Sequence, residues 1–305
     1  MDRFAALKAF TLVGHTGGFS SAARELGLAT SSVTRLIDAL EEQIGTPLLN
    51  RSTRRVTLTE TGRIYYEKAL QILADLDEAD NVAAARASEP SGLLRVSAPV
   101  TFTNLHISPL LPGLTQRYPK LQLDMRLSDA TVNLVDEAID VAIRIGTIEE
   151  QPNLIARKLS PHERYICASP VYLAQNGSPI LPEDLCGFNC LQFAYAAGRQ
   201  VWRLQSGTRI DEVQVSGNLS VNNSETLREA ALGGMGLALL PDWLVDRDIL
   251  DGKLVRVMDK FHVNPGAMDV GIYALYQANR RGSSKIKAFV DELAAALLKS
   301  KESRN

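Results

Sequence analysis

The chain has 305 residues, of which 45% are hydrophobic and 22% are charged, and its formal net charge at pH 7 is −2. This length favours two or three domains over a single core, and the composition is typical of a globular protein rather than a disordered one. The near-neutral charge excludes a basic field over the whole chain, so any binding of nucleic acid must depend on a local patch.

No apolar run reaches the about 18 residues that span a bilayer, and no charged-then-apolar leader follows the opening Met-Asp-Arg. The cysteines are Cys167, Cys186 and Cys190. An odd number of cysteines without a leader favours reduced thiols in the cytoplasm. Cys186 and Cys190 have the spacing of metal ligands or of a redox pair, but no second Cys/His pair stands at a useful distance. We therefore expect a cytoplasmic protein with no metal and no other cofactor.

The first residues predict a short helix followed by a helix-turn-helix. Residues 2–14 carry apolar side chains every three positions, which indicates one buried helical face. The residues on this face are Phe4, Leu7, Phe10 and Val13. A second helix is expected over residues 21–26 after a cap at Ser20, and Gly27 suits the left-handed position of a turn. A third helix is expected from about Thr30 to Ile44.

The third helix is expected to turn apolar side chains inward and to present hydroxyls and one arginine outward. The inward residues repeat every three or four positions: Val33, Ile37, Leu40 and Ile44. The outward residues near its start are Thr30, Ser31, Ser32, Thr34 and Arg35, with Asp38 beyond them. Short side chains let a helix enter the major groove, where hydroxyls and an arginine contact base edges or phosphates. The alternative is that these hydroxyls cap the helix and face water.

A basic segment after this helix favours DNA binding. Arg51, Arg54 and Arg55 lie within five residues, with Thr53 between them and apolar residues on either side. Residues 43–59 hold three arginines and no acid, whereas the first 66 residues carry eight Lys/Arg and six Asp/Glu. Arginines in a hairpin beside a recognition helix reach phosphates or the adjacent minor groove. We expect this segment to be a wing that anchors to the DNA backbone.

The motifs of this region resemble the DNA-binding signature of LysR-type transcriptional regulators. The shared positions are Ala22-Ala23-x-x-Leu26, Val33-Thr34-x-x-Ile37-x-x-Leu40-Glu41-x-x-Ile44-Gly45-x-x-Leu48-Leu49-x-Arg51 and Leu58-Thr59-x-x-Gly62. The family commonly has serine where Ala29 stands, which leaves Thr30 as the substitute cap. It commonly has phenylalanine where Leu49 stands, a change that a core tolerates. The missing serine moves the expected base contacts to Ser31, Ser32, Thr34 and Arg35.

From Glu60 to about Ala87 the sequence predicts one long helix. Its apolar residues step by four and three positions, which is a heptad seam. The seam consists of Tyr65, Ala69, Ile72, Leu76, Ala79 and Ala83. We expect the small first domain to have no room to bury this seam. The resemblance implies an antiparallel pair of linker helices between two subunits. The alternative is packing against the later part of the same chain.

Beyond a Pro/Ser/Gly hinge, strands and helices alternate, which predicts an open α/β sheet. The expected strands are 93–98, 121–127, 141–145, 164–168, 236–240 and 270–276, with a hairpin over 202–215. The expected helices are 109–118, 134–139, 222–232 with a capping box of Asn222 and Glu225, and one around 286–297. The resemblance implies two subdomains of periplasmic-binding-protein-like type. The expected domains are 1–60 (winged helix-turn-helix), 61–88 (linker helix) and 91–305 (regulatory), the last divided into about 91–162 with 268–300, and about 163–267.

A small effector is expected between these subdomains. Ligands of open α/β sheets bind beyond the carboxyl ends of strands and near helix N-termini. The candidate effector contacts at such places are Thr101, Phe102, Thr103, Ser128, Asn223 and Ser224. The alternative is that the hydroxyls cap helices and that Phe102 belongs to the core. Arg144 and Arg164 are candidate partners for an anion or members of structural salt bridges.

No catalytic motif competes with this interpretation. The histidines His15, His106, His162 and His262 stand in unrelated segments, and there is no Gly-x-Ser-x-Gly, P-loop or dinucleotide fingerprint. We expect a regulator that binds double-stranded DNA and a small-molecule effector, forms a homodimer or homotetramer and does not enter a membrane. The alternative is a cytoplasmic solute-binding protein or small-molecule enzyme with an accessory N-terminal domain.

Overall fold

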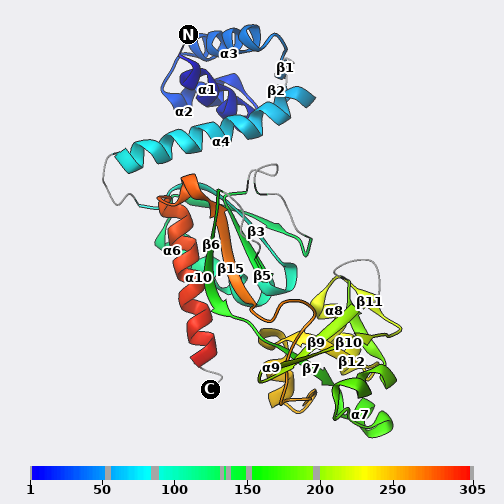
Figure 1. Cartoon of the computed structure of the whole chain (residues 1–305). Coiled ribbons are helices and arrows are strands. Elements are labelled where there is room, and N and C mark those ends of the chain that lie inside the picture. The colour runs from blue at the N-terminus through cyan, green and yellow to red at the C-terminus, as the bar shows by residue number, and fades with distance from the viewer. Residues whose placement is uncertain are drawn as a thin grey trace. The chain divides into compact units, whose positions relative to one another are not determined.

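A computed structural model describes residues 2–51, 56–83, 89–130, 134, 139–148, 153–194 and 200–302 (Figure 1). The chain forms two compact units, Met1–Leu93 with Gly282–Ser284, and Leu94–Arg281 with Lys285–Asn305. Each unit has a hydrophobic core of its own. Among the described residues, no helix combines the length and the apolar character needed to cross a membrane.

The N-terminal unit is a winged helix-turn-helix followed by a long helix (Figure 1). Its elements are α1 (Arg3–Thr16), α2 (Phe19–Leu26), α3 (Thr30–Ile44), β1 (Leu49–Arg51), β2 (Val56–Leu58) and α4 (Glu60–Ala83). The bounds of α3 are those expected from the sequence. Gly27 lies in the left-handed region at φ 65° and turns α2 into α3. Strands β1 and β2 pair antiparallel, with Leu49 opposite Leu58.

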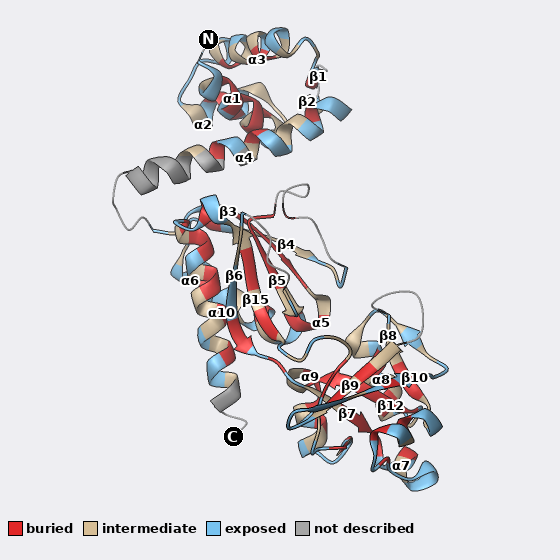
Figure 2. Ribbon diagram, in the orientation of Figure 1, coloured by how far each residue is buried: buried red, intermediate tan, exposed pale blue. Residues whose placement is uncertain are grey.

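The three short helices of this unit share one apolar core (Figure 2). Its larger buried side chains are Leu7, Phe10, Val13, Val33, Ile37, Leu40, Leu48 and Leu49. Two expectations are corrected. Phe4 is exposed, because it lies in the first turn of α1, at the edge of the packed face. Ser20 does not cap α2, because the helix begins at Phe19, two residues before the expected start, and Gly18 takes the N-cap position.

Helix α4 packs on the core of its own unit, which corrects the expectation that its seam has nowhere to pack there. Ala69 is buried, and the ring of Tyr65 meets Phe10 edge-on with the ring centroids 5.8 Å apart. Ile72, further along the seam, is 44% exposed. The side chains of Ala79 and Ala83 lie outside those described. Tyr65 and Ala69 of the seam therefore serve the fold of the unit, whereas Ile72 stays exposed.

The second unit contains a five-stranded sheet in the order β4-β3-β5-β15-β6. Its strands are β3 (Gly92–Ala98), β4 (Leu121–Leu127), β5 (Val141–Gly146), β6 (Leu154–Pro161) and β15 (Gly271–Gln277). Strands β3 and β5 are parallel, and β15 runs antiparallel to both β5 and β6. A continuous helical run follows β3, made of α5 (Val100–Phe102), a π-helix (Thr103–Ile107), a 3-10 turn (Ser108–Leu110) and α6 (Leu111–Arg117). The run begins before the expected residue 109.

Helix α10 (Ser284–Glu302) and the helical run after β3 cover one face of this sheet (Figure 1). Strand residues Leu94, Val96 and Ile143 meet Phe289 and Leu293 of α10 in the largest core cluster of the unit. The expected amphipathic C-terminal helix therefore packs with its apolar stripe against the sheet. Residues 135–138 of the expected helix over 134–139 lie outside the described residues.

A second five-stranded sheet has the order β11-β8-β12-β7-β13, and a three-stranded sheet has the order β10-β9-β14. The strands are β7 (Arg164–Ala168), β8 (Cys190–Phe193), β9 (Gln200–Ser206), β10 (Arg209–Val215), β11 (Ser220–Val221), β12 (Leu237–Pro241), β13 (Val255–Val257) and β14 (His262–Asn264). The helices around them are α7 (Pro170–Asn176), a 3-10 helix (Pro182–Gly187), α8 (Ser224–Leu232) and α9 (Asp242–Leu250). The chain passes from the first sheet to the second between β6 and β7, and returns between β14 and β15.

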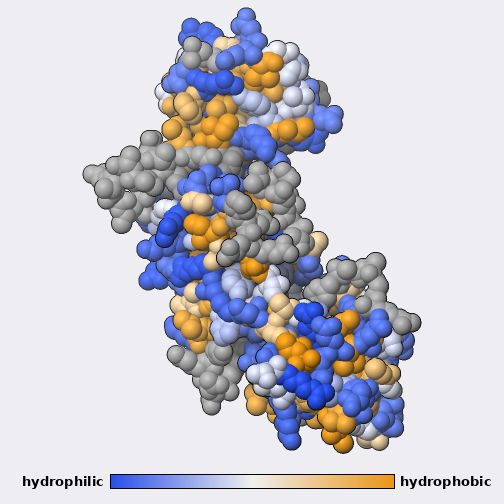
Figure 3. Space-filling model, viewed as in Figure 1, coloured by the Kyte–Doolittle hydropathy of each residue, from blue (hydrophilic) through white to orange (hydrophobic). Residues whose placement is uncertain are grey.

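Large apolar residues also remain on the surface, where they appear as orange groups among polar residues (Figure 3). The most exposed of them include Ile64 on α4, Ile180 after α7 and Leu250 at the end of α9. Scattered exposed side chains of this kind are ordinary for a folded protein. The exposed apolar residues of α4, Ile64 and Ile72, lie on the same helix as Ala69, which is buried within the unit.

Candidate DNA-binding surface and effector site

The first turns of α3 present a polar face to solvent. Ser31 and Arg35 are exposed, Ser32 and Thr34 are half-buried, and Val33 between them is fully buried in the core. The hydroxyl of Thr34 donates to the carbonyl of Thr30 at 3.0 Å, so its proton is engaged within the helix and its oxygen is left as an acceptor. The side chains expected to read bases therefore lie together on one accessible helical face.

The N-terminus of α3 has no side-chain cap among the described residues. Ala29 occupies the N-cap position and its carbonyl accepts from the amides of Ser32 and Val33. Thr30 is the first helical residue, so the expectation that it replaces the missing serine as a cap is wrong. An exposed helix N-terminus without a cap leaves backbone N–H groups directed at solvent, and these favour an anion such as a phosphate.

The side chain of Glu41, on the last turns of α3, holds the start of the wing. One carboxylate oxygen accepts from the backbone amides of Leu48 and Leu49 at 2.7 and 2.9 Å. The other oxygen lies 2.6 Å from a guanidinium nitrogen of Arg51. Gly45 at φ 78° ends α3 and reverses the chain toward these partners. The recognition helix and β1 are therefore joined by one carboxylate.

Arg51 also contacts two further groups. Its second terminal nitrogen lies 2.6 Å from Asp38, and its guanidinium lies over the ring of Phe19 at 5.3 Å from the centroid. Burial acts to lower the pKa of Arg51, but its hydrogen bonds and charge interactions with Asp38 and Glu41 raise it above the ordinary value. Of the expected wing residues, Thr53, Arg54 and Arg55 lie outside the described residues.

Gly62 fits α4 beneath this hairpin. A Cβ at this position would lie 1.9 Å from the carbonyl oxygen of Leu48, so only glycine fits. Thr59 accepts from the amide of Gly62 at 2.9 Å and donates to the carbonyl of Pro47 at 3.0 Å. The Leu58-Thr59-x-x-Gly62 motif therefore caps α4 and fixes its crossing against the segment that leads into β1.

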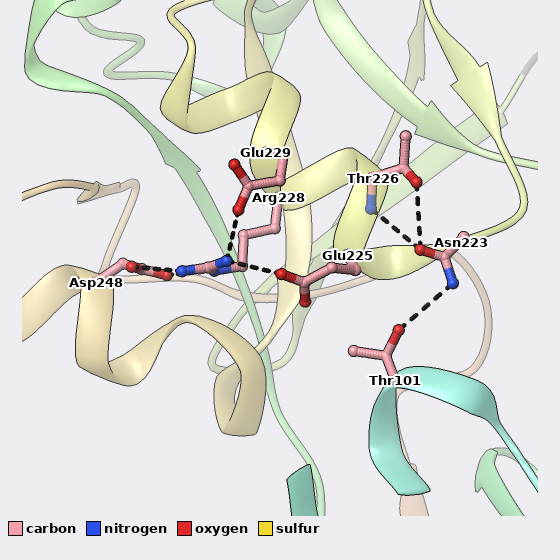
Figure 4. Close-up of polar contacts among 7 residues, drawn as sticks. All are labelled: Thr101, Asn223, Glu225, Thr226, Arg228, Glu229 and Asp248. Atoms are coloured by element: carbon pink, nitrogen blue, oxygen red, sulfur yellow. Dashed lines mark hydrogen bonds and ion pairs between the residues drawn. The ribbon is translucent and has the colours of Figure 1, made fainter. Parts of the chain in front are cut away.

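In the second unit, Asn223 at the start of α8 contacts Thr101 of α5 (Figure 4) and Asp129 in the loop after β4. Its side-chain amide donates to the hydroxyl of Thr101 at 3.4 Å and to the carboxylate of Asp129 at 3.1 Å. Its oxygen accepts from the backbone amide of Thr226 and caps α8. The capping residue is thus Asn223 and not the expected Asn222, because α8 begins at Ser224.

Asp129 is the residue of this cluster that the sequence did not single out. Its other carboxylate oxygen accepts from the backbone amide of Val100 at 3.1 Å, at the start of the helical run after β3. The available signal was its position directly after a strand of period two, beside Ser128. Ser128 accepts from the amide of Ala130 at 3.1 Å and stabilises the loop locally.

Phe102 and Thr103, two of the expected effector residues, are buried. Phe102 is fully buried, and its ring packs edge-on against Trp243 with the centroids 5.3 Å apart. His106 contacts both rings. Thr103 is also buried, and its hydroxyl has no hydrogen-bond partner among the described residues. The helical run turns Phe102 and Thr103 toward its packed side, and their contact with an effector stays a prediction.

The remaining candidates have structural partners. Arg164, the first residue of β7, donates to the side chain of Asn264, the last residue of β14, which joins the ends of these two strands. Arg144 donates to the carbonyl of Ile143 at 3.0 Å. Ser224 is the first residue of α8 and is half-buried. Of the six expected effector contacts, the structure brings Thr101 and Asn223 into direct contact, with Ser224 next to Asn223 in the chain.

Helix α8 is held to α9 by Arg228 (Figure 4). The guanidinium makes a two-pronged interaction with Asp248, one bond of which measures 2.7 Å, and lies 2.8 Å from both Glu225 and Glu229. The hydrogen bonds to Asp248 raise the pKa of Arg228 above its ordinary value. The two helices that carry Asn223 and Trp243 are thereby fixed to each other by a bidentate ion pair.

The cysteines form no metal site in the described part of the chain, where no group of three or more His, Cys, Asp or Glu is placed to hold an ion. Burial raises the pKa of the Cys167 and Cys190 thiols to about 12, so both stay protonated at neutral pH. Cys186 is exposed. Cys167 and Cys190 behave as small apolar core residues.

Two family models match this chain. One, described as a bacterial regulatory helix-turn-helix protein of the lysR family, matches residues 4–63, and the other, described as a LysR substrate binding domain, matches residues 87–298. The first covers the helix-turn-helix, the wing and the start of α4. The second covers the three sheets of the second unit and most of α10.

Characterised relatives match over nearly the whole length. The transcriptional regulator DmlR of Escherichia coli (strain K12) is 35% identical over 290 residues, 94% of this chain and 92% of the relative. The transcriptional regulator CrgA of Neisseria meningitidis serogroup C (strain 8013) is 33% identical over 296 residues, 95% and 96% of the two chains. The solved structure of CrgA from Neisseria meningitidis is similar with a TM-score of 0.61 at 31% identity, covering 96% of this chain and 98% of the other.

Proposed function

This chain belongs to the LysR family of transcriptional regulators, and we propose which of its residues bind DNA, where its effector binds and how its subunits associate. As a member of the family it is a DNA-binding transcriptional regulator with an effector-binding domain, and its relatives are regulators rather than enzymes. The DNA-binding part corresponds to residues 1–60, the linker to 61–88 and the regulatory part to 91–305. Since a bacterial regulatory protein binds DNA inside the cell, we propose that this protein is cytoplasmic.

The recognition helix reads the operator through its exposed first turns. Ser31, Ser32, Thr34 and Arg35 contact base edges in the major groove, where hydroxyls and arginine match the donor and acceptor pattern of bases. Thr30 and the uncapped amides of α3 contact a phosphate. The observation that carries this proposal is the bare, solvent-exposed N-terminus of α3 directly before a polar face.

The wing supplies the contacts to the DNA backbone. Thr53, Arg54 and Arg55 stand in a segment of three arginines and no acid, within a chain of net charge −2. Such a local positive patch provides affinity that does not depend on sequence and that falls with rising salt. One copy of so modest a patch binds weakly, so two copies joined through α4 are needed for tight binding to a two-fold operator.

The effector binds in the regulatory part, between subdomains of about 91–162 with 268–300 and about 163–267. Thr101, Ser128, Asn223 and Ser224 are the residues we assign to it, together with Asp129. The contact of Asn223 with both Thr101 and Asp129 supports this assignment, because a ligand placed there touches the helical run after β3 and the start of α8 at once. Effector binding then alters the spacing of the two DNA-binding heads, and a coupling of about 1–3 kcal/mol is enough for such a switch.

The proposal is tested with the DNA upstream of the protein's own gene. Full-length wild type, Arg35→Ala and Arg54→Ala are titrated against this duplex at fixed salt. Arg35→Ala is expected to lower affinity for the protected sequence and to relax its base preference, whereas Arg54→Ala lowers affinity for every sequence. Unchanged affinity of both variants would show that the DNA-binding surface lies elsewhere. Footprints with and without candidate metabolites then test for an effector.

A further inference from the structure

Arg51 is a cation with two carboxylates for partners. Its two terminal nitrogens lie 2.6 Å from Asp38 and 2.6 Å from Glu41. One positive and two negative charges leave the group with a net charge of −1. Arg51 was expected to contact the DNA backbone beside Arg54 and Arg55, but a group of net negative charge does not attract a phosphate, and releasing the guanidinium would break both ion pairs.

The same arginine joins three elements of the N-terminal unit. It belongs to β1, it is paired with two residues of α3, and its guanidinium lies over the ring of Phe19 in α2. The Glu41 carboxylate that it meets also accepts from the amides of Leu48 and Leu49. The direction in which β1 leaves the helix-turn-helix is therefore fixed by contacts at both of its ends.

Arg51 is the last residue of β1, and the segment after it carries Arg54 and Arg55. We propose that Arg51 is a positioning residue, which with Asp38 and Glu41 holds the wing to the recognition helix so that Arg54 and Arg55 reach the DNA, and that it makes no phosphate contact itself. This inference depends on the proposed DNA-binding function and goes beyond it. It assigns a favourable role in DNA binding to two acidic residues.

Substitution of Asp38 distinguishes a positioning role from a purely electrostatic one, because the two predict opposite changes in DNA affinity. If Asp38 affects DNA only through its charge, Asp38→Asn removes repulsion and tightens binding. If Asp38 positions Arg51, the same variant weakens binding. Glu42→Gln is the matched control, since Glu42 lies on the same helix, is exposed and forms no ion pair among those described.

Arg51 itself is tested with a variant that keeps its charge. Lysine cannot bridge two carboxylates with the planar fork of arginine, so Arg51→Lys and Arg51→Gln are expected to reduce affinity to a similar extent, about tenfold. They are also expected to lower the salt dependence of binding equally, because Arg54 and Arg55 lose their phosphates in both variants. A phosphate contact predicts the reverse. Arg51→Lys would then bind nearly as wild type, and Arg51→Gln would lower the slope of log affinity against log salt by about 0.9 for each phosphate that the protein no longer neutralises.

The probe is a duplex selected from a random-sequence pool with the full-length wild-type protein. Weaker binding by Asp38→Asn, unchanged or tighter binding by Glu42→Gln and equal decreases for the two Arg51 variants support the proposal. Tighter binding by Asp38→Asn, or full retention by Arg51→Lys, overturns it. If the pool yields no enriched duplex, the proposed DNA-binding function itself fails and takes this inference with it.

A measurement without DNA guards against variants that merely fold poorly. Hydrogen exchange is followed at the amides of residues 48–51 and 56–58, with those of α1 as the internal reference. The positioning role predicts faster exchange in the hairpin of Asp38→Asn and Arg51→Lys, no change in Glu42→Gln and no change in α1. Wild-type exchange in the hairpin of both variants would show that Arg51 does not hold the wing.

Discussion

Asn223 donates its side-chain amide to the carboxylate of Asp129 at 3.1 Å. Through this bond the first turn of α8, beside one sheet, is joined to the loop that follows β4 of the other sheet. Asp129 in turn accepts from the amide of Val100, so the contact reaches the start of the helical run after β3. An effector that binds here must either replace this link or add to it.

Asn223→Asp is expected to break the link and leave α8 intact. Aspartate caps a helix about as well as asparagine does, so the bond from Thr226 persists, but the two donors are removed and a second carboxylate faces Asp129. We expect exchange of the amides in residues 100–107 to become several-fold faster, in line with a destabilisation of about 1 kcal/mol, while the melting temperature changes little. Asn222→Asp is the control, since Asn222 is exposed and does not cap α8. Equal exchange in the two variants would mean that the link carries no stability.

Asp140 is the centre of a buried ion cluster in the first sheet of the second unit. It accepts from Arg280 at 2.9 Å, from Lys285 at 3.2 Å and from the amide of Arg95 at 2.9 Å, and the side chains of Asp140 and Arg280 are each 5% exposed. Asp140→Asn leaves two buried cations facing a neutral group, so a decrease of about 3–5 kcal/mol in unfolding free energy is expected.

Urea unfolding monitored by tryptophan fluorescence measures this decrease, because Trp202 and Trp243 are the only tryptophans and both lie in the second unit. Asp124→Asn serves as the comparison. Asp124 pairs with Arg95 at 3.3 Å but is about one-third exposed, so less than about 1 kcal/mol is expected. Similar decreases in the two variants would contradict the view that burial makes the Asp140 cluster costly to break.

Local patterns in the sequence predicted many of the helices and strands, but they did not predict which distant residues contact one another. The repeat of Val33, Ile37 and Leu40 placed α3 correctly, because a helix buries one face at a fixed period. The partners of Arg51 could not be read in the same way. The contact with Asp38 depends on how far the chain turns back after Gly45, and the sequence records the charges without their distances.

Short buried strands, and the partner against which a helix face packs, were not predicted for a related reason. Strand β8, Cys190–Phe193, has four residues and no alternation, so its pattern does not distinguish it from a loop. Ala69 fits a dimer seam and a domain core equally well by period, and only the position of α1 decides that it is buried within the unit. Asp129 was passed over because its role depends on Asn223, ninety-four residues later.

His162 links stability of the second unit to pH. It lies between β6 and β7, its side chain is fully buried, and its Nδ1 is 3.3 Å from Asp242. Burial lowers the pKa of His162 in the folded protein, and the charge of Arg164 adds to this effect. The hydrogen bond and charge of Asp242 and the charge of Glu163 act to raise the pKa but do not offset the burial. The unfolded chain therefore binds the proton more readily, and stability falls as the pH drops below about 6.5, the ordinary value for histidine.

His162→Gln is expected to reduce the fall in melting temperature between pH 7 and pH 5, since glutamine does not titrate. Asp242 affects the pH dependence of stability below this range of pH 7 to pH 5. Burial acts to raise its pKa, but the hydrogen bond and charge of His162 and backbone amides lower it, so its contribution disappears only below the ordinary carboxyl range. His262→Gln, at an exposed position of the same unit, should retain the wild-type pH dependence. The same slope in wild type and His162→Gln would exclude His162 as its source.

The exposed part of α4 is the surface through which we expect two subunits to pair. Ala69 and Leu73 are buried within the unit, but Ile72 is 44% exposed and Ile64 is 65% exposed. Placing a charge at Ile72 leaves the core untouched and opposes burial against a second helix. Ile72→Asp should therefore sediment as a smaller species than wild type at the same concentration. It should also bind a two-fold operator more weakly, because the two DNA-binding domains are no longer joined.

Ile180→Asp makes the same substitution at an isoleucine that is 78% exposed in the second unit, and should sediment as wild type. If Ile72→Asp keeps the wild-type mass while Ile180→Asp loses it, the subunits pair through the second unit and not through α4.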